Sequence, residues 1–221
     1  MQIPVLAYAS GISVFLPVAV GATRIRSLDQ ALKIFLLLQT IYALTIVAQF
    51  YLAIEHTTNL WISHVYAVIE YPFLMAVFSL WQKNRIVEKA MLISIAFFVA
   101  FWVVASIYLE PFTAPAKYSN SLSRMIYCAV GLYTLRKISL ESTSPILKDP
   151  RFWIISSLLI SSTGDLMFYA LRGVISGLSQ QELLTAFGIH WILIIVTNLL
   201  YSVGYICTSP KNSGGLSALA Q

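Results

Sequence analysis

Charged side chains are scarce in this 221-residue chain. Asp, Glu, Lys and Arg make up 10% of the residues, whereas about a quarter of a soluble domain is charged. Hydrophobic residues reach 58%, and the mean hydropathy is +0.79. This composition excludes an ordinary soluble domain and indicates an integral membrane protein.

Cysteine is also rare. Cys128 and Cys207 are the two cysteines of the chain, within one apolar segment and at the end of another. Two cysteines so placed do not support a disulfide framework. We interpret both as small, buried apolar side chains.

Seven apolar segments are long enough to cross a bilayer core, which takes about 20 helical residues. They span residues 4–22, 31–54, 60–81, 90–109, 118–135, 152–171 and 187–206. The fifth is the most polar, because Asn120, Ser123 and Arg124 occupy its first half. We predict an all-α polytopic membrane protein. Residues 1–207 form a single seven-transmembrane-helix bundle with no soluble catalytic module, and the Ser- and Gly-rich tail 208–221 is disordered.

Lys and Arg are divided unequally between the two sets of loops. Eleven of the 14 fall in the first, third and fifth loops and the tail, while Lys117, Arg124 and Arg172 fall on the other side. Because cytoplasmic loops carry the excess of Lys and Arg, we expect the amino terminus outside and the carboxyl terminus in the cytoplasm of a bacterial inner membrane. The net charge of +5 is then a topology signal, and we expect no nucleic-acid partner.

The segment 152–171 carries Asp165. Ser161 and Ser157 lie one and two helical turns earlier and Tyr169 one turn later, so these polar groups share one helical face. A carboxylate inside a membrane helix is costly unless it meets a partner, a cavity or a proton, and it therefore marks a functional-site hypothesis.

A second polar face lies on segment 60–81. Asn59, Ser63, Tyr66 and Glu70 are spaced by four, three and four residues, which places them on one side of a helix. Glu70 falls near the bilayer midplane, and Pro72 interrupts the helical hydrogen bonds beside it. The lone histidine of this segment, His64, lies about 120 degrees round from Glu70 near the outer end, and we interpret it as an interfacial side chain.

Three other segments add polar groups. Gln49 shares a stripe with Tyr42 and Thr45, and His190 is aligned with Tyr201. For Arg124, two interpretations remain open: its side chain reaches the headgroups, or it pairs with one of the two buried carboxylates. The complete set expected to line a polar cavity in the outer half is Asp165, Glu70, His190, Tyr66, Arg124, Gln49, Asn198 and Tyr169.

Three functions fit such a cavity. The first is a sensor or accessory signalling protein that binds a small molecule or lipid and acts through a cytoplasmic or membrane partner. The alternative is an intramembrane lipid hydrolase in which Asp165, Glu70, His190 and His64 bind zinc or act as acid and base. The chain has no HxxxH or HExxH spacing, so we expect no cofactor outside this alternative. A small-solute or proton-coupled transporter is third.

Several resemblances bear on these alternatives. Microbial rhodopsins share the seven spans, but they attach retinal to a lysine of the last span, and residues 187–206 contain none. The stretch GDLMFYALRG around Asp165 resembles the aspartate-bearing motif of lysoplasmalogenase-type membrane hydrolases. Alkaline-ceramidase-like hydrolases use several histidines in a paired pattern. In this chain His190 stands alone and departs from that pattern.

A broader resemblance covers about half of the chain. It is carried by Asn59, His64, Tyr66 and Glu70, by DPRFWI at 149–154, and by His190, Asn198 and Tyr201. In these residues the chain resembles small seven-helix proteins of bacteria, especially Bacteroidetes-like ones. The resemblance implies a fold rather than a reaction.

Overall fold

The computed structural model describes residues 4–113, 116–141, 145–175 and 180–208. Within these ranges all regular secondary structure is helical. The helices are α1 (Val5–Ser13), α2 (Phe15–Thr23), α3 (Gln30–Ile54), α4 (Leu60–Leu80), α5 (Arg85–Tyr108), α6 (Lys117–Glu141), the short 3-10 turn η1 (Ile146–Lys148), α7 (Pro150–Ile175) and α8 (Gln180–Ile206).

Six helical segments of the described chain are long and apolar enough to cross a membrane. They are Val5–Thr23, Gln30–Ile54, Leu60–Leu80, Arg85–Tyr108, Pro150–Tyr169 and Leu184–Ile206. The prediction of an all-helical membrane protein is therefore confirmed for the described residues. The helix α6 is as long as α3 but much less apolar, which agrees with the polar character expected for the fifth segment.

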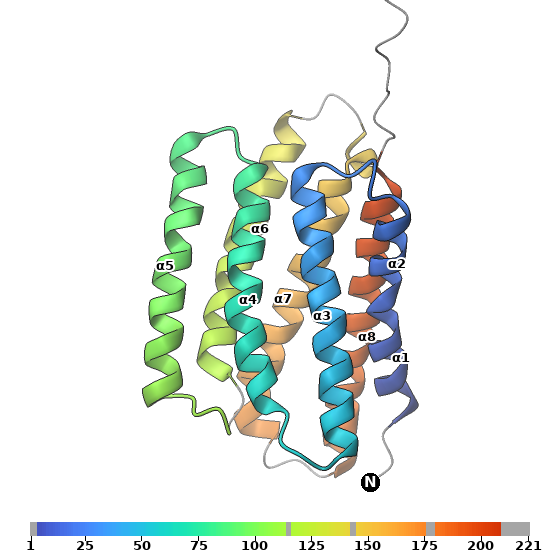
Figure 1. Cartoon of the computed structure of the whole chain (residues 1–221), viewed down its shortest axis with the longest axis vertical. Coiled ribbons are helices and arrows are strands. Elements are labelled where there is room, and N and C mark those ends of the chain that lie inside the picture. The colour runs from blue at the N-terminus through green and yellow to red at the C-terminus, as the bar shows by residue number, and fades with distance from the viewer. Residues whose placement is uncertain (1–3, 114–115, 142–144, 176–179, 209–221) are drawn as a thin grey trace, which may run out of the picture.

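The helices run roughly parallel to one another in a single bundle (Figure 1). Helix α8 packs on α7 and on the α1–α2 segment, α6 packs on α7, and α3 packs on α2 and α4. The contacts thus close a ring in the order α2, α3, α4, α6, α7 and α8. Helix α5 packs on α4 and α6 at the left edge of Figure 1, and most of its surface is exposed, as expected for a helix facing lipid.

The two ends of the bundle differ in charge. The α2–α3 and α4–α5 connections, η1 and the end of α8 lie at the upper end in Figure 1, together with most of the Lys and Arg residues. We call this the basic end. The start of α1 and the α3–α4 connection lie at the opposite end (Figure 1).

The first membrane segment is broken into α1 and α2 at Val14. Pro17 follows three residues later, and its missing N–H cannot bond to the carbonyl of Ser13. A Cβ at Gly11 would lie 2.7 Å from Phe50 Cε2, and one at Gly21 would lie 2.6 Å from Leu36 Cδ1. The two glycines therefore let α3 approach both halves of this segment closely.

Side chains fix where several helices begin. Asp29 Oδ1 accepts a hydrogen bond of 2.8 Å from the backbone N–H of Leu32 at the start of α3. Asn84 Oδ1 accepts one of 2.9 Å from Ile86 at the start of α5. Such caps satisfy N–H groups that have no partner within the helix, and both lie at the basic end.

The apolar core fills the half of the bundle nearest the basic end. Its fully buried members include Phe35 of α3, Met75 and Phe78 of α4, Ile155 of α7 and Tyr205 of α8. The opposite half of the same helices is more polar. The core therefore holds the helices together at one end and leaves their other halves available to form a site.

Several expected boundaries differ from the observed helices. Helix α6 continues to Glu141 beyond the expected end at residue 135, and α8 begins at Gln180 rather than at residue 187. Amphipathic turns extend these helices past their apolar stretches. The predicted tail begins with Thr208, which is buried and lies 3.2 Å, hydroxyl to hydroxyl, from Ser27; residues 209–221 lie outside the described residues.

Candidate functional site

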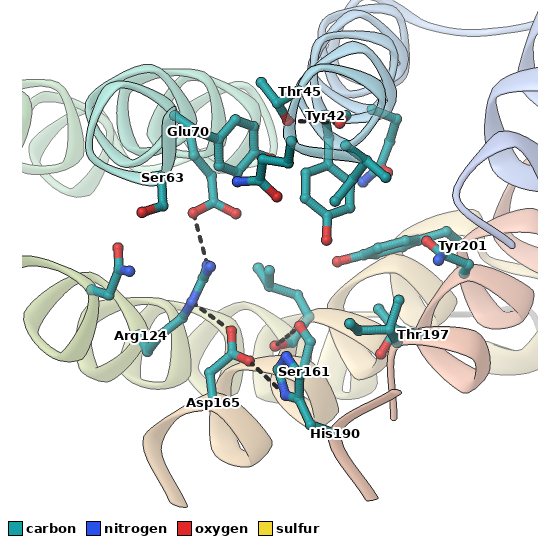
Figure 2. A pocket seen from close by; sticks show the side chains of 18 of the residues that line it. Tyr42, Thr45, Ser63, Glu70, Arg124, Ser161, Asp165, His190, Thr197 and Tyr201 are labelled. Carbon is teal, nitrogen blue, oxygen red and sulfur yellow. Dashed lines mark hydrogen bonds and ion pairs between the residues drawn. The ribbon is translucent and has the colours of Figure 1, made fainter. Parts of the chain in front are cut away.

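A polar cavity of about 330 Å³ lies in the half of the bundle away from the basic end. It is enclosed by α3, α4, α6, α7 and α8 (Figure 2). The described residues that line it are Gln39, Tyr42, Thr45, Ile46, Gln49, Ser63, Tyr66, Glu70, Asn120, Arg124, Leu158, Ser161, Asp165, Tyr169, His190, Ile194, Thr197, Asn198 and Tyr201. All eight residues predicted from sequence to line a cavity are in this set.

Arg124 joins the two carboxylates of the cavity. Its Nη1 lies 2.9 Å from Glu70 Oε2, and its Nε lies 2.9 Å from Asp165 Oδ2. Figure 2 shows the three side chains, from α6, α4 and α7, pointing toward one another. The side chains are 13%, 11% and 18% exposed for Arg124, Glu70 and Asp165. Of the two interpretations of Arg124, the structure therefore shows pairing, and it shows pairing with both carboxylates.

The local sequence explains how two of these groups reach the cavity. On α4, Ser63, Tyr66 and Glu70 follow helical spacing, and all three line the cavity. On α7, Gly164 precedes Asp165, and a Cβ at Gly164 would lie 2.6 Å from Leu193 Cδ1 of α8. The missing side chain lets α8 approach α7 closely beside the carboxylate.

His190 of α8 lies next to Asp165. The distance from His190 Nδ1 to Asp165 Oδ1 is 3.7 Å, which is too long for a hydrogen bond and short enough for an ion pair when the imidazole is protonated. The imidazole stacks on the ring of Phe168, with ring centroids 5.0 Å apart and planes at 26°. This stacking holds the histidine beside the carboxylate at the cavity wall.

The cavity contains one more carboxylate than guanidinium. Among the described lining residues, Glu70 and Asp165 carry two negative charges when ionised, and Arg124 carries one positive charge. The cavity then holds one excess negative charge while His190 is neutral. A proton or a bound cation would balance it, because an uncompensated buried charge is strongly unfavourable.

Four tyrosines form much of the remaining wall. The rings of Tyr42 and Tyr66 lie 5.2 Å apart at 41°, and Tyr169 accepts a hydrogen bond of 3.0 Å from Asn120 Nδ2. Figure 2 shows Tyr42 and Tyr201 directed into the same space. The wall is therefore both aromatic and rich in hydroxyl groups.

Sequence reasoning did not select every lining residue. Tyr42 and Tyr201 share helical stripes with Gln49 and His190, but neither is among the eight residues predicted to line the cavity. Gln39 lies one turn before Tyr42, so extending the Gln49 stripe backwards would have found it. Asn120 was noted as a polar residue of the fifth segment, and its helical position one turn before Arg124 was the available signal.

Two side-chain oxygens in the wall have no hydrogen-bond partner among the described residues. They are Gln39 Oε1 and Thr197 Oγ1, and both residues are about 94% buried, being 6% exposed. Buried polar atoms are normally paired. These two oxygens would accept hydrogen bonds from a ligand or from water.

Two predicted binding residues also tie the helices together. Asn198 Nδ2 donates a hydrogen bond of 2.9 Å to Ser13 Oγ of α1. The backbone carbonyl of Gln49 accepts one of 3.1 Å from Asn59 Nδ2 at the start of α4. Both residues line the cavity, so they contribute to its shape as well as to its polarity.

His64 does not join the other candidate residues. It is fully buried and not interfacial, and its ring lies 5.0 Å from that of Phe112 in the α5–α6 connection. The 120-degree offset from Glu70 along α4 turns it away from the cavity. The four-residue set of the hydrolase alternative is therefore not assembled, since Glu70, Asp165 and His190 line the cavity without it.

A zinc site is not formed by the described residues. No group of three His, Cys, Asp or Glu side chains in this part of the chain is placed to hold a metal ion. Arg124 occupies the space between the two carboxylates, where a shared metal would have to bind. The residues present therefore do not fit the zinc that the hydrolase alternative requires.

Comparison with protein-family models, curated proteins and solved structures found no match to this chain. The resemblance to small seven-helix bacterial proteins therefore stays a prediction.

Proposed function

We propose that this chain is a seven-helix integral membrane protein that binds a small, positively charged organic molecule in the cavity around Arg124. In this proposal α6 also crosses the membrane, as the fifth of seven crossings in chain order. The amino terminus is external, and the basic end faces the cytoplasm of a bacterial inner membrane. The unequal distribution of Lys and Arg supports this orientation.

The proposed crossing by α6 is supported by where its polar residues lie. The helix has 25 residues, enough for about 37 Å at 1.5 Å per residue. Asn120, Ser123 and Tyr127 are buried within the bundle, and Arg124 is neutralised by two carboxylates. Since the polar side chains face other helices, the helix can meet lipid with its apolar side.

The observation that carries the proposed ligand class is the excess of one carboxylate over guanidinium in a mostly buried cavity. A protonated amine would restore the balance. It would also donate hydrogen bonds to acceptors in the wall, including Gln39 Oε1. The tyrosine rings favour the same ligand, because a cation is attracted to the face of an aromatic ring.

The size of the cavity limits the ligand. A volume of about 330 Å³ lies at the lower end of the range for small-molecule pockets, about 300–1,000 Å³. We therefore propose an amine smaller than a typical drug molecule. A whole phospholipid does not fit this volume.

A ligand in this cavity would contact five helices at once. Binding would favour one packing arrangement of α3, α4, α6, α7 and α8 over another. The loops at the basic end would transmit this change in packing to a cytoplasmic or membrane partner. This is the sensor or accessory signalling role expected from the sequence.

The test is ligand-dependent stabilisation of the purified protein. A panel of amines of up to about ten heavy atoms, each paired with a neutral isostere such as 2-phenylethylamine with 2-phenylethanol, is screened by thermal unfolding in detergent. Amines should stabilise the protein, by about 2.7 kcal/mol at 100 times the Kd. Stabilisation by the neutral isosteres, and by no amine, would contradict the proposal.

The matched variants are Asp165→Asn and Glu55→Gln. Asp165 lines the cavity, whereas Glu55 is exposed at the same end of the bundle and outside it. Each change removes one negative charge. Asp165→Asn should abolish stabilisation by amines, and Glu55→Gln should leave it intact.

An intramembrane hydrolase is the second candidate, and the pair of His190 with Asp165 favours it. In this case purified protein would cleave a lipid ester, and both His190→Gln and Asp165→Asn would abolish cleavage. Stoichiometric zinc that is lost in Asp165→Asn would point to the metal-dependent version.

A further inference from the structure

An apolar groove runs along the outer surface of the bundle between α5 and α6, separate from the polar cavity. Its volume is about 390 Å³. Its wall includes Val87, Ala90, Met91, Ile126, Ala129 and Tyr133. Two alanines in this wall leave room between helices that otherwise carry larger apolar side chains. The groove has the apolar lining that an acyl chain requires.

A basic depression of about 470 Å³ adjoins the groove at the basic end of the bundle. Its wall includes Lys83, Arg136, Lys137 and Glu141, and it shares Tyr133 with the groove. Arg136 and Lys137 follow Tyr133 by three and four residues, so they lie one helical turn further along the same side of α6. The groove and the depression therefore adjoin each other at Tyr133.

The depression has an excess of positive charge. Lys83 Nζ pairs with Glu141 Oε2 at 2.8 Å, which neutralises one lysine. Lys137 Nζ donates a hydrogen bond of 3.4 Å to Gln82 Oε1 and stays cationic. Arg136 is exposed, and no ion pair to it is found within the described ranges. Two positive charges thus remain for an anionic group.

We infer that the groove and the depression together form a binding site for one anionic phospholipid, with its phosphate at Arg136 and Lys137 and an acyl chain between α5 and α6. Anionic headgroups attract Lys and Arg at the membrane surface with about 1 kcal/mol per residue. Arginine also binds phosphate through paired N–H groups. The inference rests on the membrane location of the helices and does not depend on the ligand of the polar cavity.

The site is tested by titrating the purified protein in detergent with dioleoylphosphatidylglycerol or dioleoylphosphatidylcholine and counting bound lipids by native mass spectrometry. One phosphatidylglycerol should bind more tightly than the rest, and more tightly than phosphatidylcholine. The double variant Arg136→Gln with Lys137→Gln should lower the affinity for this lipid about tenfold or more. Equal binding of the two lipids would overturn the inference.

A matched control is Arg26→Gln with Lys33→Gln. These two residues are exposed at the same end of the bundle but outside the depression, and the change in net charge is identical. This control should leave the tight lipid bound. An equal loss in both double variants would overturn the inference, because the attraction would then be diffuse.

The acyl-chain half of the site is tested by Ala129→Phe, which fills the groove without changing charge. Ala100→Phe is its control, because Ala100 is exposed on α5 outside the groove. Only Ala129→Phe should weaken the binding of phosphatidylglycerol. Unchanged binding in Ala129→Phe, or displacement of the lipid by inorganic phosphate, would show a headgroup or phosphate site alone and overturn the inference.

Discussion

The two halves of this bundle use the same helices for opposite purposes. Near the basic end, Phe35, Met75, Phe78 and Tyr205 fill the interior at 0–1% exposure. In the other half the interior holds a cavity with two carboxylates, a guanidinium and an imidazole. Uncharged side chains pack into a continuous core in one half. In the other half the charged side chains require polar partners, and a cavity remains between the helices. The comparison indicates that the core supplies rigidity so that the polar half can contain a site.

Removing the positive charge of Arg124 should have the largest effect on the stability of the polar half. Arg124→Gln leaves Glu70 and Asp165 facing each other without a positive charge, and losing one partner of a buried ion pair costs about 3–5 kcal/mol. The free energy of unfolding, measured by SDS titration, should fall by that amount.

The same variant can be repaired if charge is the cause. A triple variant that adds Glu70→Gln and Asp165→Asn removes the unpaired carboxylates and should recover most of the lost free energy. If the single and triple variants are equally unstable, the packing of the Arg124 side chain, not its charge, would be what the polar half depends on.

The contrast between core and cavity can be measured with one truncation in each half. Leu74 is 2% exposed in the core, and Leu74→Ala should lower the free energy of unfolding by about 2–3 kcal/mol because it leaves a void. Ile194 already borders the cavity, so Ile194→Ala should cost less than half as much. Equal losses would mean that the cavity half is packed as tightly as the core.

Two glycines allow a smaller test of the same contrast. A Cβ at Gly204 would lie 2.9 Å from Ile154 Cγ1 and 3.3 Å from the backbone oxygen of Pro150. Gly204→Ala should therefore cost about 1–2 kcal/mol, as overpacking does. At Gly164 the nearest atom is the tip of the flexible Leu193 side chain, which can shift more easily than backbone, so Gly164→Ala should cost less. Thermal unfolding of the two variants under one condition decides the order.

The smallest effect is expected from one interhelical hydrogen bond. Ser157 Oγ donates to the backbone oxygen of Thr197 at 2.8 Å and links α7 to α8. Ser157→Ala should cost about 0.6 kcal/mol, the average for such bonds in membranes. Thr163 is exposed and bonds within α7, so Thr163→Ala is the control and should not change the free energy of unfolding measurably.

Much of the cavity could be predicted because helical spacing is a local property. Ser63, Tyr66 and Glu70 had to share a face of α4 once that segment was helical, and Ser161, Asp165 and Tyr169 had to share a face of α7. The cost of a buried carboxylate then indicated that both faces turn inward. Convergence of the two faces on one cavity was an expectation that helical spacing alone did not determine, and the pairing of Arg124 with both carboxylates was not predicted.

The residues that sequence reasoning misplaced or omitted depend on packing between helices. His64 looked interfacial because it lies near a helix end, but the α5–α6 connection covers it with Phe112. Tyr42 and Tyr201 share helical stripes with Gln49 and His190, but they carry no charge, so the cost of burial did not single them out as binding residues. Their role in the wall follows from the arrangement of α3 and α8 around α4 and α7.

The sequence by itself determined the helical membrane character, the basic end and the polar faces, because hydropathy and helical periodicity are properties of short segments. Only the tertiary structure decided that Arg124 stands between Glu70 and Asp165, that His64 is excluded, and that one carboxylate exceeds the available cation. These properties depend on which helices are neighbours and on the depth at which their polar turns meet, and both are set by packing between residues far apart in the chain.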